Sequence, residues 1–130
     1  MSEGDADFRG RWRIVETEGW DQDALDLVGP AEISFGADGG GELKMIAIGA
    51  DVDYLVSERN GRARVEFSWS GFDDGDPSCG RGFAEREGDR LVGMLFIHRG
   101  DASSFLAEPW RSGDDRRPTS RSSGRPKRRR

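Results

Sequence analysis

Apolar and polar residues alternate with a period of two along much of the chain. The clearest run covers residues 64–70, where Val65, Phe67 and Trp69 alternate with charged and hydroxyl side chains. Successive side chains of an extended strand point to opposite faces, so this pattern predicts a strand with one face in the core and the other in water.

Turn residues separate the alternating runs at regular intervals. Asn60-Gly61 favours the positive φ angles of a type I′ turn and predicts a hairpin over residues 51–70. Gly88-Asp89 and the glycine-rich stretch 38–41 predict two further hairpin turns. The predicted strands are residues 9–18, 31–35, 42–48, the two halves of 51–70, 81–87, 90–98 and 103–110.

About eight short antiparallel strands joined by short turns favour an all-β, up-and-down barrel, because closure removes the exposed edges of a flat sheet. Residues 19–30 do not fit a strand and predict a short helix or ordered loop that ends at Gly29-Pro30. The residues expected inside the barrel are Trp12, Ile14, Ile33, Phe35, Tyr54, Val56, Val65, Phe67, Trp69, Phe83, Leu95 and Phe105.

The length of 130 residues allows one domain, and the charged fraction of 35% predicts a highly polar surface. Residues 8–110 are assigned to the β-barrel domain. Residues 1–7 and the basic tail 111–130, which contains no large apolar side chain, are expected to be disordered.

Charge is distributed unevenly along the chain. Residues 111–130 hold nine Lys and Arg against two Asp, a surplus of seven positive charges, so residues 1–110 carry −12 within the total of −5. The tail could contact phosphates of a nucleic acid. It has no aromatic residue for base stacking, and the acidic body would repel a polyanion, so nucleic-acid binding is the less favoured role.

The compartment is inferred from features that the chain lacks. The N-terminal residues show no secretory signal pattern, and no apolar run is long enough for a membrane span. Cys79 is the only cysteine, which excludes an internal disulfide and fits a reducing compartment. The expected location is the cytoplasm, with no membrane partner.

Gly10-Arg11-Trp12, at the beginning of the first strand, resembles the first-strand signature of the calycins, the lipocalin and avidin type of barrel. This resemblance implies that Trp12 closes one barrel end and that an arginine covers it; Arg111 and Arg99 are the candidates. The secretory signal, long first loop and C-terminal helix of lipocalins are missing. Residues 10–110 also resemble small uncharacterised bacterial proteins, which implies no activity.

Three groups of residues are candidates for chemistry. Asp21, Asp23 and Asp26 offer carboxylates to a hard cation, but their spacing does not complete a calcium loop, and a solvated helix start is the favoured interpretation. His98 and Cys79 lack a recognisable catalytic partner in the sequence. The prediction is therefore no catalytic residue, no metal site and no cofactor, with an enzyme using carboxylates and His98 at a barrel mouth as an alternative.

Two predicted strands, residues 44–48 and 91–97, carry apolar side chains on both faces, although the outside of a simple barrel should be polar. Residues 23–28, a second copy of the chain or another partner protein could cover the outer side. The predicted partner face consists of Met45, Ile46, Ile48, Met94 and Phe96.

These observations favour a non-enzymatic binding or interaction protein. Its binding partner would be a small apolar molecule or a protein. The protein partner could be a second copy of the same chain, which would give a homodimer. The residues expected to border a ligand cleft are Trp12, Trp20, Tyr54 and Trp69.

Overall fold

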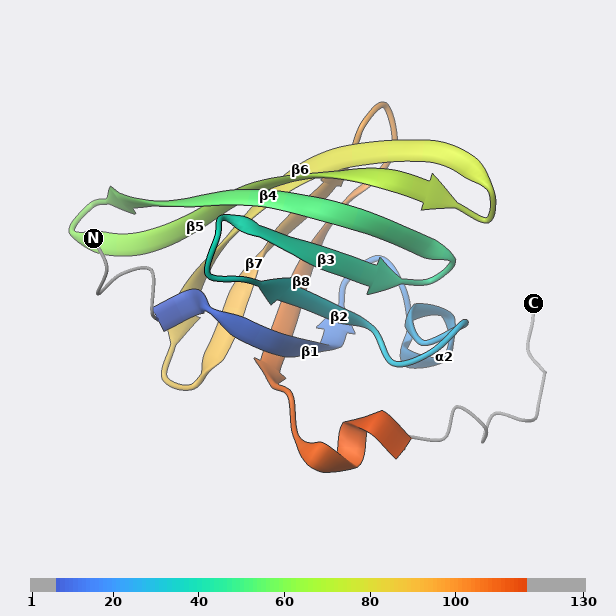
Figure 1. Cartoon of the computed structure of the whole chain (residues 1–130), viewed down its shortest axis with the longest axis horizontal. Coiled ribbons are helices and arrows are strands. Elements are labelled where there is room, and N and C mark those ends of the chain that lie inside the picture. The colour runs from blue at the N-terminus through green and yellow to red at the C-terminus, as the bar shows by residue number, and fades with distance from the viewer. Residues whose placement is uncertain (1–6, 117–130) are drawn as a thin grey trace.

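A computed structural model describes residues 7–116, which form a closed antiparallel barrel of eight strands in sequential order (Figure 1). The strands are β1 Gly10–Thr17, β2 Glu32–Phe35, β3 Gly40–Met45, β4 Ile48–Arg59, β5 Arg62–Asp73, β6 Asp76–Glu87, β7 Arg90–Ile97 and β8 Ala102–Pro109. A short helix, α2 (Gln22–Leu25), lies between β1 and β2, and a 3₁₀ helix, η1 (Ser112–Arg116), follows β8.

The predicted fold class is confirmed, including the short helix after the first strand. Asn60 and Gly61 have φ angles of 55° and 80°, as a tight turn between two twisted strands requires. Gly88 also has a positive φ, of 65°, at the turn between β6 and β7. Of the segments expected to be disordered, residues 1–6 and 117–130 lie outside the described residues.

The strand predicted over residues 42–48 is wrong in one respect, because the chain turns at Ile46 and Ala47. Ile46 has a φ of 58°, and its backbone N–H donates to the carbonyl of Leu25 at 2.8 Å. Met45 and Ile48 consequently face each other across the turn, and both are buried in the core. The apolar excess of this segment therefore fills the barrel and does not lie on its outside.

Aromatic side chains of β5 fill the barrel interior where the neighbouring strand, β6, carries glycine. A Cβ atom built on Gly80 would lie 2.7 Å from the Trp69 ring, and one on Gly82 would lie 2.5 Å from the Phe67 ring. Each glycine thus leaves room that an indole or phenyl ring occupies. The buried core residues are Phe8, Trp12, Ile14, Leu25, Ala31, Ile33, Phe35, Leu43, Met45, Ile48, Val52, Tyr54, Val65, Phe67, Trp69, Ala84, Leu91, Leu95, Phe105 and Ala107.

Phe83 is the one predicted interior residue that points outward. Ala84 pairs with Val65 and Gly93 on the inner side of the sheet, so its neighbour Phe83 must face the other way. The Arg64 guanidinium lies 4.1 Å from the centre of the Phe83 ring on the outer surface. Val56 packs against the core but is only partly buried.

Replacing Gly93 with alanine should lower the free energy of unfolding by about 2–3 kcal/mol, because overpacking forces backbone to move. The added Cβ would lie 1.9 Å from the Phe83 carbonyl oxygen, which is itself part of the β6 backbone. Gly49→Ala is the matched control, since a Cβ there meets nothing within 4 Å. Urea denaturation of both variants measures the difference, and equal stability would contradict the predicted close approach.

Different segments close the two ends of the barrel. At the Phe8 end, Phe8 is fully buried and its carbonyl accepts a hydrogen bond from Trp12 Nε1 at 2.9 Å. Arg86 covers the Trp12 ring at 5.5 Å and donates to the Asp7 carbonyl, so neither Arg99 nor Arg111 takes the role expected from the calycin resemblance. At the α2 end, Leu25 is fully buried and accepts from Ile46.

Candidate functional site

The four residues predicted to border a ligand cleft are distributed along the barrel. Trp12 lies at the Phe8 end, and Tyr54 donates through its hydroxyl to the Gly36 carbonyl near the turn between β2 and β3. Trp69 lies toward the C-terminal end of β5. Trp20, just before α2, is partly buried and packs against the core. Three of the four are core residues, and they do not gather at one end of the barrel.

Trp69 differs from the other buried aromatic residues because its polar atom has no partner. The side chain is only 3% exposed, and its Nε1–H makes no hydrogen bond within the described part of the chain. A buried donor without an acceptor costs free energy, on the order of 1–3 kcal/mol. Trp12 avoids this cost by donating to Phe8.

The predicted partner face is divided by the fold. Met45 and Ile48 lie in the core, and Ile46 packs against it beside α2, so these three do not share a surface with the other two. Met94 and Phe96 point outward from β7. Residues 23–28 were one candidate cover for the outer side, but the structure places this segment at the α2 end, where Leu25 contacts Ile46.

The outward apolar side chains of three neighbouring strands form a continuous surface, which we call the outer β6–β8 face. Strand register places Phe83 beside Met94 and Val92 beside Leu106, with Phe96 next along β7. The Phe83 and Phe96 rings lie 6.2 Å apart, and Val92 is 37% exposed. Large apolar groups gathered on the outside of a closed barrel are typical of an interaction surface.

Two arginines lie on the aromatic rings of this face, and their surroundings differ. Arg64 stacks on Phe83 and forms an ion pair with Glu85 at 3.3 Å. Arg81 stacks on Phe96 at 4.3 Å, and no described carboxylate lies within ion-pair distance of it. A guanidinium held against a ring keeps its planar set of N–H donors directed outward, ready to bind a carboxylate.

The Asp21, Asp23 and Asp26 cluster is divided between two structural roles. Asp21 caps α2 by accepting from the Ala24 N–H at 3.0 Å, and Asp23 is exposed in the first turn. Asp26 accepts two hydrogen bonds from Arg13, at 2.7 and 2.9 Å. Within residues 7–116, no three His, Cys, Asp or Glu side chains group closely enough to hold a metal ion.

The Asp26–Arg13 pair fastens the α2 segment to the outside of β1. Arg13 is 3% exposed, although it points away from the barrel interior. Burial of the Asp26 carboxyl raises its pKa, whereas hydrogen bonds from Arg13, Gln22 and the Ala31 amide lower it, and the net result is a pKa below the ordinary value. The sequence pattern does not reveal this role of Arg13, because its partner Asp26 comes from the irregular segment after β1.

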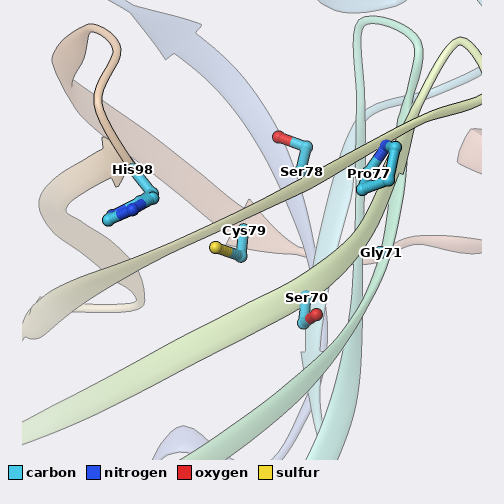
Figure 2. Close-up of a pocket in the computed structure, with 6 residues that line it drawn as sticks. All are labelled: Ser70, Gly71, Pro77, Ser78, Cys79 and His98. Carbon is cyan, nitrogen blue, oxygen red and sulfur yellow. The ribbon is translucent and has the colours of Figure 1, made fainter.

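A pocket of about 240 Å³ lies on the outer surface near the α2 end, between β5, β6 and the end of β7 (Figure 2). Its lining includes Cys79, His98 and the hydroxyl residues Ser70 and Ser78. The backbone N–H of His98, the residue directly after β7, donates to the Cys79 carbonyl at 2.8 Å, so the two residues lie side by side. Figure 2 shows the Cys79 sulfur directed toward the part of the pocket where His98 lies, while the imidazole extends away from the sulfur.

The sequence carries a signal for this proximity in the spacing of the two residues from the hairpin turn. In the hairpin centred on Gly88-Asp89, residues at equal distances from the turn oppose each other, as Gly80 and Ile97 do. The next pair outward is Cys79 and His98. Hairpin register therefore joins the only cysteine and the only histidine of the chain.

Two further results bear on the class of protein. No helix among residues 7–116 combines the length and apolar character needed to cross a lipid bilayer. Comparisons with protein-family models and with curated protein sequences give no match to this chain.

Proposed function

We propose that this chain is a non-enzymatic interaction protein that binds a partner protein through the outer β6–β8 face. The observation that carries this proposal is the pair of outward-facing rings, Phe83 and Phe96, beside Met94, with Arg81 stacked on one ring and free of carboxylates among the described residues. Aromatic residues, methionine and arginine are the types enriched at protein interfaces.

The packing of the barrel supports an outward-facing site. Inward positions of β5 carry Val65, Phe67 and Trp69, and the space above Gly80 and Gly82 is taken by two of these rings. A small barrel filled in this way leaves its binding capacity to its ends and its outer surface.

The charges of the face indicate the chemistry of the partner. Arg64 shares the Glu85 carboxylate with Arg62, whereas Arg81 has no carboxylate partner among the described residues, so Arg81 is the cation of the face that is most available to a new group. The partner should therefore offer an apolar side chain to the rings and a carboxylate to Arg81. A second copy of the chain is the less favoured occupant, because residues 1–110 carry −12 and two bodies would repel each other.

Photo-crosslinking of the full chain in its source organism tests this proposal. A benzophenone amino acid in place of Met94 should give a discrete crosslinked product with one protein, identified by mass spectrometry. The additional change Arg81→Glu should reduce the yield by about tenfold or more, because it sets a carboxylate against the partner's carboxylate.

The control carries the same crosslinker in place of Leu55, which is 60% exposed on β4 outside this face. Equal products from both positions, or a product unaffected by Arg81→Glu, would contradict the proposal. A product consisting of two copies of this chain would replace the proposed partner with a homodimer.

A further inference from the structure

The pocket near the α2 end combines features that the outer β6–β8 face does not use. It is concave, its lining contains a thiol and an imidazole, and the remaining lining is small or hydroxylic: Ser70, Gly71, Pro77 and Ser78. The cysteine is free and exposed, so a small molecule in solution can reach the sulfur.

We propose that Cys79 and His98 act together as a thiol-modification site that reacts with small disulfides. The imidazole of His98 accepts the thiol proton, and the sulfur of Cys79 attacks one sulfur of the disulfide. A new S–S bond forms to Cys79, the original S–S bond breaks, and the released thiolate takes the proton from His98. The products are a mixed disulfide on the protein and one free small thiol.

The backbone holds both groups in place on regular structure. Cys79 lies within β6 and pairs with Ser70 of β5. His98 follows β7 in a tight turn, in which the Ile97 N–H donates to the Asp101 carbonyl at 2.9 Å and its own N–H bonds to Cys79. Directly opposed residues on neighbouring strands have Cβ atoms about 4.5–5.5 Å apart, so a change of the His98 side-chain rotamer can bring the imidazole to the thiol.

The pocket also provides space for the group that would be attached. Its volume is about 240 Å³, and Ser70, Ser78 and Pro77 line it together with Cys79 and His98. No carboxylate lines it, so its immediate lining does not repel a thiolate. A cysteine next to a base in such a setting is the type that reacts selectively.

The rate of reaction of the folded full chain with dithiodipyridine at pH 7 tests this proposal through the absorbance of the released thiopyridone. His98→Gln should slow the reaction by about tenfold or more, because the thiol loses its proton acceptor. Imidazole added to His98→Ala should restore part of the rate, since the pocket can admit it. Cys79→Ser should not react.

A positioning effect must be separated from a general loss of structure. The wild-type chain unfolded in urea gives the rate of the same thiol without assistance, and the folded chain should react faster than this reference. Equal rates for the wild type and His98→Gln, or a folded rate below the unfolded rate, would overturn the proposal. These outcomes do not depend on the outer β6–β8 face, so either proposal can fail without the other.

Discussion

Replacing Asp26 with alanine should lower the free energy of unfolding by about 3 kcal/mol, as expected when one member of a buried ion pair is removed. Arg13 would keep its charge while its side chain is only 4% exposed, and its remaining carboxylate neighbour, Asp114, is 3.9 Å away. The Ala31 N–H would also lose its acceptor. Urea denaturation at neutral pH measures the effect.

Gln22→Ala is the control, because Gln22 is exposed and its side chain makes a hydrogen bond to Asp26, while its backbone bond from the Asp26 N–H is kept in the variant. It should change the free energy of unfolding by no more than about 0.5 kcal/mol. A loss below 1 kcal/mol for Asp26→Ala would show that water solvates Arg13 easily, and the pair would then not fasten the α2 segment to β1.

The same carboxyl gives a pH dependence of known sign. The pKa of Asp26 is lower in the folded state than its ordinary value of 3.8, so the folded state binds fewer protons. Its contribution to stability is complete above this value and is lost as the pH falls through the folded-state pKa. The difference between the wild type and Asp26→Ala should therefore decrease below about pH 4.

The strands could be predicted because two local signals agree. Period-two alternation locates a strand, and turn dipeptides such as Asn60-Gly61 fix where it ends. The turn at Ile46 and Ala47 could not be predicted from the sequence, because it contains no turn-forming residue. A backbone hydrogen bond to Leu25, which is distant in the sequence, holds Ile46 at positive φ. Phe83 was misassigned because its neighbours in the sequence do not reveal which face of β6 lies inside.

The residues of the candidate sites could be predicted only where the alternation within a single strand shows which side chains point outward. Met94 and Phe96 alternate with inward residues of β7, and the sequence identified them as outward. The stacking of Arg81 on Phe96 and the neighbourhood of Cys79 and His98 depend on pairing between strands. Such contacts require the register to be derived first, and each hairpin turn already determines it.

Replacing Trp69 with alanine should lower the free energy of unfolding by about 3–5 kcal/mol, because it empties the space over Gly80 in a filled barrel. Trp69→Phe should cost far less. Phenylalanine retains a ring over Gly80 and also removes the indole N–H, which is buried without a partner among the described residues. The smaller ring lowers the free energy of unfolding, whereas removal of the unpaired donor raises it. The net change in the free energy of unfolding should therefore be within about 1 kcal/mol.

Thermal or urea denaturation of the two Trp69 variants distinguishes packing from polarity at this position. If Trp69→Phe is as damaging as Trp69→Ala, the indole N–H must have an acceptor in solution, such as a buried water or a bound molecule. That result would indicate that the barrel interior can bind water or a small molecule next to Trp69. A small effect for Trp69→Phe would instead identify the indole as a space-filling group, which leaves binding to the outer surface.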